Sequence, residues 1–189
     1  VRLPSRIQTA ADLFQRNLLR LDFPHRRLLR KTLYALQDFL PAAVIDGNID
    51  KPAPGYFTHV DKVISLAAAK GLYIALLPTW GDKVDKQWGK GPEIFTPENA
   101  YRYGKWLGER YMNAPNLIWV IGGDRSGEGN KSRIWNALAN GIRSIDQGHL
   151  MTFHPHGEHS SSFWFHDEEW LSFNMIQTGH AQRNYAIYR

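Results

Sequence analysis

The sequence predicts an α/β protein of the (β/α)8 TIM-barrel type, here a partial barrel whose first and last strands are not recognisable. Two observations carry this prediction: short apolar runs alternate with segments of helical periodicity, and each apolar run ends in glycine and polar residues. Strand, loop and helix repeated in this order give parallel strands joined by right-handed crossovers. The polar strand ends should then share one face, which is where barrel enzymes keep their active sites.

Four apolar runs are predicted as the parallel strands, near residues 71–77, 116–121, 149–153 and 173–176. The second run is the clearest, because five consecutive apolar residues that include β-branched and aromatic side chains suit a strand covered on both faces. It ends at Gly122 and Gly123, which let the backbone turn sharply and leave room for a ligand. Asp124 and Arg125 follow directly, so both are candidates for a site at this strand end.

Helices are predicted between the strands, over 56–70, from 97 to about 111, and over 132–145. The second begins most clearly: Thr96 is an N-cap residue, Pro97 suits the first turn, and Glu98 lies near the positive end of the helix dipole. Each segment places its apolar residues at helical spacing, so each is expected to cover the sheet with one face.

The composition divides the chain at residue 46 into a basic segment, 1–45, and a barrel-like domain, 46–189. Residues 1–45 hold eight Lys and Arg residues against Asp12, Asp22 and Asp38, while the remaining 15 basic and 15 acidic residues cancel. A basic amphipathic helix of this kind binds nucleic acid or a membrane surface in some proteins. We favour a solvated helical face, because no recognised nucleic-acid-binding motif accompanies the arginines.

Several classes of function are excluded by what the sequence lacks. The absence of Cys rules out disulfides, thiol nucleophiles and thiolate metal sites. The nucleotide-binding glycine motifs and the serine-hydrolase elbow are also missing, and no apolar run is long enough to span a membrane. We therefore expect no cofactor, no nucleic acid and no membrane as partners. No signal peptide is visible, and the localisation is left open.

The strand ends favour carboxylate chemistry on a carbohydrate. Asp124 is the best proton donor, because partial desolvation after a buried strand favours the protonated acid. The other candidate substrate-binding residues follow the predicted strands and are Trp80, Asp82, Arg125, His154, His156, Gln177 and His180. Less specific roles stay open: an ion pair with Arg125 or a helix cap for Asp124, core packing for Trp80, and a turn for Asp82.

Two alternative functions remain on this evidence. A non-catalytic carbohydrate-binding protein would hold a sugar against Trp80 without cleaving it. A metal-dependent hydrolase would use the cluster His154, His156 and His159, with Asp124 as an oxygen ligand. Histidines that face substrate or are satisfied by the protein are more common, so we expect no metal.

Four long motifs lie at or near the predicted strand ends: Leu76 to Asp82, Gly91 to Thr96, Asn116 to Arg125 and Phe173 to His180. Together they resemble motifs of the apiosidase-like glycoside hydrolases. The resemblance implies a bacterial barrel enzyme of a family whose founding activity removes apiose from a pectin side chain. It also implies that Asp124, in the Gly-Gly-Asp-Arg motif, is a catalytic carboxylate, and that relatives are often exported.

Two departures from that family affect the expected activity. Residues 1–45 do not show the family's first strands, and its second catalytic Glu lies on a strand after the element that ends at His180. Asp82, Glu93 and Glu128 lie on strand ends or in the following loops, but none matches that second acid. We therefore expect the 189-residue chain alone to be nearly inactive.

Overall fold

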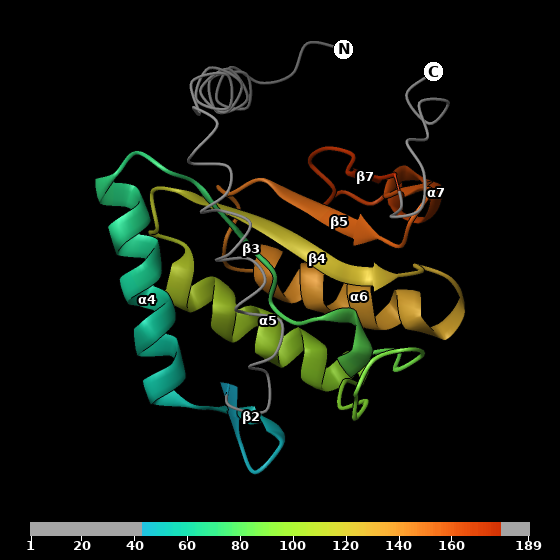
Figure 1. Cartoon of the computed structure of the whole chain (residues 1–189), viewed down its shortest axis with the longest axis horizontal. Helices are drawn as coiled ribbons and strands as arrows, with labels where there is room; N and C mark the ends of the chain where they lie inside the picture. Colours follow the sequence, from blue (N-terminus) through green and yellow to red (C-terminus); the bar gives the residue numbers. More distant parts are fainter. Residues whose placement is uncertain (1–42, 179–189) are drawn as a thin grey trace. The chain divides into compact units, whose positions relative to one another are not determined.

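A three-stranded parallel sheet lies in the middle of the computed structural model, which describes residues 43–178 (Figure 1). Its strands are β3 (Ile74–Leu76), β4 (Leu117–Arg125) and β5 (Met151–Pro155), in the order β3-β4-β5. Ala75 pairs with Ile118 and Val120 pairs with Thr152, both in parallel register. Three of the four predicted parallel strands are thus confirmed, and closure into a barrel stays a prediction.

The fourth predicted strand, 173–176, is wrong as a parallel strand. The segment runs beside β5, where Ser172 N–H donates to the Met151 carbonyl at 2.8 Å. Hydroxyl groups replace the next ladder bonds, because Met151 N–H donates to Ser172 Oγ and Thr152 Oγ1 donates to the Phe173 carbonyl. The chain then forms β7 (Ile176–Gln177), which pairs antiparallel with the short strand β6 (His159–Ser160) in the loop after β5.

Three helices, α4 (Pro54–Ala69), α5 (Pro97–Tyr111) and α6 (Gly129–Arg143), confirm the predicted helical segments within a few residues. Thr96 caps α5 as predicted: its hydroxyl accepts from Asn99 N–H while the Asn99 side chain accepts from Thr96 N–H. Two short helices, η1 (Gly81–Lys83) and α7 (Ser162–Phe165), follow β3 and β6.

Helices α5 and α6 lie along one face of the sheet and pack directly against each other (Figure 1). Glycines make this approach possible, because a Cβ atom on Gly104 would lie 2.3 Å from the Leu138 carbonyl oxygen. A Cβ on Gly141 would lie 2.2 Å from the Tyr101 carbonyl oxygen. Between helices and sheet, Trp119 and Trp135 are fully buried and form the centre of an aromatic core.

A hairpin that the sequence analysis did not predict joins β1 (Val44–Ile45) to β2 (Asn48–Pro52). The connecting residues Asp46 and Gly47 both have positive φ, 54° and 67°, as a type I′ turn requires. The Asp-Gly pair is a sequence signal for this turn, so the hairpin is predictable from the sequence.

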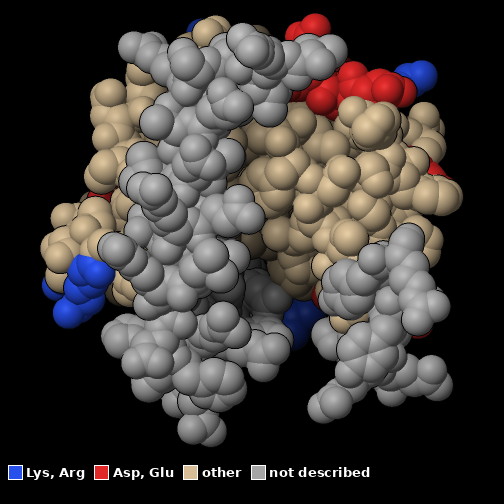
Figure 2. Space-filling view, turned by 90° about the horizontal axis from the view of Figure 1, so that it is seen from above, with Lys and Arg blue, Asp and Glu red and all other residues tan. Residues whose placement is uncertain are grey.

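On the face shown in Figure 2, most of the visible acidic side chains lie together in one area, and the visible basic side chains lie at separate places. Nearly all of the basic segment 1–45 lies outside the described residues, so the nucleic-acid alternative for it stays untested. No helix within 43–178 is long and apolar enough to cross a bilayer.

Candidate active site

The carboxyl end of β4 leaves the sheet over two residues. Gly122 pairs with His154, but the next pair along the ladder is Arg125 with Pro155, so Gly123 and Asp124 bulge out of register. The φ angles of Gly122, Gly123 and Asp124 are 94°, 128° and 55°, all in the region that L side chains rarely adopt. Aspartate tolerates the left-handed conformation better than most residues, and here it places Asp124 beyond the sheet edge.

The glycines around this bulge are required by space as well as by φ. A Cβ on Gly123 would lie 2.8 Å from Cε3 of Trp80 and 2.9 Å from the backbone nitrogen of Gly81. A Cβ on Gly81 would lie 2.1 Å from the Gly123 carbonyl oxygen. The ends of β3 and β4 therefore approach each other backbone to backbone, and this approach brings Trp80 next to the segment that carries Asp124.

Four of the predicted site residues come together at this point. Gln177 donates from Nε2 to Oδ1 of Asp124 at 2.5 Å, and His154 Nδ1 lies 3.8 Å from the same oxygen. The rings of Trp80 and His154 meet edge to face, with centroids 5.8 Å apart. The side chains of Asp124 and His154 are 24% and 23% exposed, so both are held by the protein and still open to solvent.

His154 has two incompatible hydrogen-bonding arrangements. Its Nδ1 lies 3.3 Å from the backbone N–H of Asp124, which it can accept only when that nitrogen is unprotonated. The same nitrogen lies 3.1 Å from the Pro155 carbonyl, to which it donates only when it is protonated. The tautomer of the His154 ring therefore decides whether Nδ1 accepts from the backbone of Asp124 or donates to the Pro155 carbonyl.

Arg125 faces away from this group. Its side chain donates to the main-chain carbonyls of Asp85, Lys86 and Asp124, at 2.5, 3.0 and 2.8 Å. Arg125 is fully buried, and this burial lowers the pKa of its guanidinium although three nearby carboxylates act to raise it. The Arg125 side chain therefore holds the loop after η1. The Asp124 carboxylate is bound by Gln177 instead.

The Asp82 carboxylate accepts hydrogen bonds within the same loop. Its Oδ2 accepts from Lys83 Nζ at 3.1 Å and from the backbone N–H groups of Lys90 and Gly91 at 3.1 and 2.9 Å. Asp82 is 6% exposed. These contacts match the turn-forming role that the sequence left open for Asp82, and they make it a poor candidate for substrate binding.

His156 and His159 belong to a separate aromatic cluster. Their ring centroids are 4.0 Å apart, and both rings pack against Trp164, at 5.4 and 5.3 Å. The Nδ1 atoms of both histidines face the Gly157 carbonyl. In the part of the chain that the structure describes, no group of three or more His, Asp or Glu side chains could hold a metal ion, so the metal alternative gains no support. His180 lies outside the described residues.

The other acids considered as partners of Asp124 are engaged at the surface. Glu93 accepts from Lys86 N–H and from Lys131 Nζ, and these bonds lower the pKa of its carboxyl group. Glu128 accepts from Trp164 Nε1 at 3.4 Å and is exposed.

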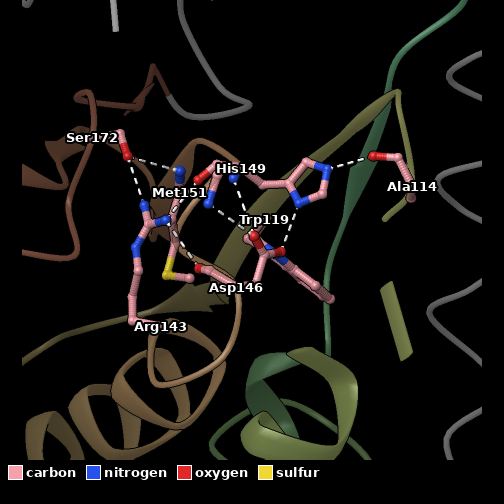
Figure 3. A network of polar contacts seen from close by, with 8 residues as sticks. Ala114, Trp119, Arg143, Asp146, His149, Met151 and Ser172 are labelled. Carbon is pink, nitrogen blue, oxygen red and sulfur yellow. Dashed lines mark hydrogen bonds and ion pairs between the residues drawn. The ribbon is translucent and has the colours of Figure 1, made fainter. Parts of the chain in front are cut away.

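Sequence analysis missed a buried polar network that lies at the opposite, amino-terminal end of β5 (Figure 3). Asp146 Oδ2 accepts from Trp119 Nε1 at 2.7 Å and from His149 Nδ1 at 2.6 Å, while His149 Nε2 lies 2.6 Å from the Ala114 carbonyl. Both ring nitrogens face acceptors, so both donate and His149 is the charged imidazolium. No sequence motif predicts this network, because its members come from four separate segments.

The pKa values in the network follow from these bonds. Burial raises the pKa of Asp146, but the hydrogen bonds from His149 and Trp119 outweigh it and lower the value to about 2. Burial lowers the pKa of His149, but the Asp146 carboxylate and the Ala114 carbonyl together raise it. Arg143 donates to the His149 and Trp170 carbonyls and to Ser172 Oγ, so the network connects α6 to the segment after α7.

Comparison with known proteins adds the evolutionary context of this site. A family model described as "Apiosidase-like, catalytic domain" matches residues 30–189. A solved structure described as a glycoside hydrolase family 5 protein from Bacteroides vulgatus is 50% identical, with a TM-score of 0.61 over 69% of this chain and 28% of that chain. Another, described as a glycoside hydrolase, is 45% identical, with a TM-score of 0.61 over 68% of this chain and 28% of that chain.

The matched region thus corresponds to 28% of the length of each of these two structures. A search of curated proteins finds no match.

Proposed function

The chain belongs to the family of apiosidase-like catalytic domains, and on this premise we propose that Asp124 is a catalytic carboxylate in the hydrolysis of a polysaccharide side-chain sugar. The family and the solved structures support a glycoside hydrolase-like domain. We further propose that its substrate is a side-chain sugar such as apiose, and that Asp124 donates the proton to the leaving oxygen.

The observation that carries this proposal is the position of Asp124. The bulge at Gly123 lifts its carboxylate out of the sheet, and the Gln177 amide fixes Oδ1 from outside β4. The carboxylate stays partly exposed, as a group that must reach substrate requires. In the proposed step, the carboxyl group gives its proton to the glycosidic oxygen as the bond from that oxygen to the anomeric carbon breaks.

His154 and Trp80 are proposed to line the substrate side. The His154 ring lies beside the Asp124 carboxylate, with Nδ1 3.8 Å from Oδ1, and the Trp80 ring packs against the His154 ring. Gln177 orients the acid by occupying one of its two oxygens. Asp82 and Arg125 support the same site indirectly, because they hold the loop between η1 and α5.

The proposal needs a second carboxylate that attacks the sugar or activates water. Asp82, Glu93 and Glu128 are each bonded elsewhere. Saccharide binding without turnover, the non-catalytic alternative, is therefore the competing function for residues 43–178.

The test compares Asp124→Asn with Asp167→Asn, a matched change of an exposed aspartate on the segment after α7. Asparagine also tolerates a positive φ, so Asp124→Asn keeps the bulge while removing the proton donor. Because the 189-residue chain is expected to be nearly inactive by itself, hydrolysis of aryl glycosides and of apiose-bearing pectin fragments is assayed with a version extended by the segment that would supply the second carboxylate. In that extended version we expect Asp124→Asn to lose about 10²- to 10⁴-fold in kcat. Unchanged hydrolysis by its Asp124→Asn variant would remove Asp124 from the mechanism, and saccharide binding without hydrolysis by the extended version would favour the non-catalytic alternative.

A further inference from the structure

Trp88 is the most exposed of the large apolar side chains in the described residues, at 69%. Single apolar side chains are common at protein surfaces, so exposure alone assigns no role to this ring. Here the Arg125 guanidinium lies over the ring, with Cζ 4.5 Å from the ring centroid. Most of the indole surface nevertheless remains open to solvent.

The loop that carries Trp88 is held at several points. The Asp82 carboxylate accepts from the backbone of Lys90 and Gly91, and Lys83 Nζ donates to the Gly91 carbonyl at 2.5 Å. Arg125 binds the carbonyls of Asp85 and Lys86 immediately before Trp88. The bonds on both sides of Trp88 restrict the loop, so little conformational entropy remains to be lost when a ligand binds there.

The same arginine connects this ring to the proposed acid. Arg125 follows Asp124 in the chain and donates from Nη1 to the Asp124 carbonyl at 2.8 Å. Trp88 thus contacts the side chain of the residue that directly follows Asp124. A saccharide would need more than one sugar residue to reach both Asp124 and Trp88.

Residues beside Trp88 indicate the chemistry of the ligand. Lys86, Gln87 and Lys90 are exposed and polar, so the indole is an isolated apolar face within a polar loop. A protein partner or a lipid would need a contiguous apolar area, which a single ring does not provide. A sugar ring has the matching form, with one face of C–H groups and a rim of hydroxyl groups that polar side chains can bind.

We propose that Trp88 is a saccharide-stacking platform that binds a sugar residue beyond the one cleaved at Asp124. This inference rests on the proposed function, since it concerns the remainder of the same polysaccharide. The stacking interaction would add affinity for longer saccharides and would leave the proton-transfer step itself unchanged.

The experiment follows the indole N–H signals of the seven tryptophans by NMR while oligosaccharides cleaved from pectin side chains are added. An Asp124→Asn background prevents turnover, and Trp88→Phe assigns the Trp88 signal by its loss. We expect that signal to shift, and we expect Trp88→Ala to bind the oligosaccharides about three- to tenfold more weakly. Trp88→Phe should retain more of the affinity, because it keeps an aromatic face. Tyr101→Ala, a change of another exposed aromatic residue on α5, should bind like the parent.

Equal affinity of Trp88→Ala and its parent would overturn the platform and leave the proposed function in place, provided that the Trp80 signal responds to the saccharide. Absence of binding and of any indole shift would count against both the platform and the proposed function. If Tyr101→Ala lost as much saccharide affinity as Trp88→Ala, the platform would also be overturned, because the loss would then not be specific to the loop that contains Trp88.

Discussion

The side-chain amide of Gln177 donates a hydrogen bond to Oδ1 of Asp124, although 53 residues separate the two in the chain. The bond joins the bulged end of β4 to β7, which is itself held by antiparallel pairing with β6. The orientation of the proposed acid thus depends on a segment that follows the three-stranded sheet in the sequence.

Replacement of Gln177 should therefore impair catalysis with little effect on stability. In a version of the domain extended by the segment that would supply the second carboxylate, we expect Gln177→Leu to lower kcat/KM about tenfold, because one oxygen of Asp124 loses its donor and the carboxylate turns more freely. Gln147→Leu, a change of an exposed glutamine in the loop after α6, is the matched control and should leave the activity unchanged. Full activity of Gln177→Glu would contradict this role, since a second carboxylate at this position would repel the first.

Gly123→Ala should destabilise the protein and displace Asp124. The added Cβ would meet Trp80 and the backbone of Gly81 at under 3 Å, at a φ of 128° that alanine rarely adopts. We expect a loss of roughly 2 kcal/mol or more in the free energy of unfolding, measured with urea. The control is Gly55→Ala in α4, where a Cβ meets nothing within 4 Å, and it should be neutral or slightly stabilising. Equal effects of the two changes would show that the close approach to Trp80 is not tight.

Stability should depend on pH through Asp146 and His149. The pKa of Asp146 is lowered from 3.8 to about 2, so its contribution is present above pH 3.8 and is lost as the pH falls toward 2. The pKa of His149 is raised from 6.5, so its contribution is complete below pH 6.5 and is lost as the pH rises through the raised value. The pair should therefore stabilise the fold most between these limits.

Urea unfolding at a series of pH values tests this pair. We expect the free energy of unfolding of the unmodified chain to fall between pH 6.5 and alkaline pH. The free energy of unfolding of the His149→Gln variant should fall less over the same range. The Asp146 shift corresponds to about 2 kcal/mol lost at strongly acid pH. An identical dependence above pH 6.5 in the variant would mean that His149 does not carry the charge assigned to it.

Removal of metal ions should not affect the protein. His154, His156 and His159 form no three-ligand group with other His, Asp or Glu side chains in residues 43–178, so we expect no stoichiometric metal after purification without added ions. Activity and unfolding should be the same before and after dialysis against EDTA. A loss of activity that zinc restores would revive the metal-dependent alternative.

Much of the architecture was predictable because it is encoded locally. The apolar run before Gly122 predicted β4, and Thr96 with Pro97 predicted the start of α5, since periodicity and capping involve residues close in the chain. One predicted element is wrong for a physical reason: at 173–176, hydrogen bonds of the Ser172 and Thr152 hydroxyl groups replace the ladder bonds of a strand. The hairpin at Asp46 is an element that the sequence analysis does not predict, although its Asp-Gly turn is a known signal.

The sequence by itself determined the family, the parallel direction of three strands, and the position of Asp124 at a strand end. Only the tertiary structure decided which candidate side chains meet. It places Gln177 and His154 beside Asp124. It also directs the side chains of Asp82 and Arg125 toward the loop that contains Trp88. Sequence patterns report which face of an element is buried, whereas these contacts depend on a two-residue bulge in β4 and on the approach of Gly81 to Gly123. Such long-range geometry has no local signature, because it arises from the packing of segments far apart in the chain.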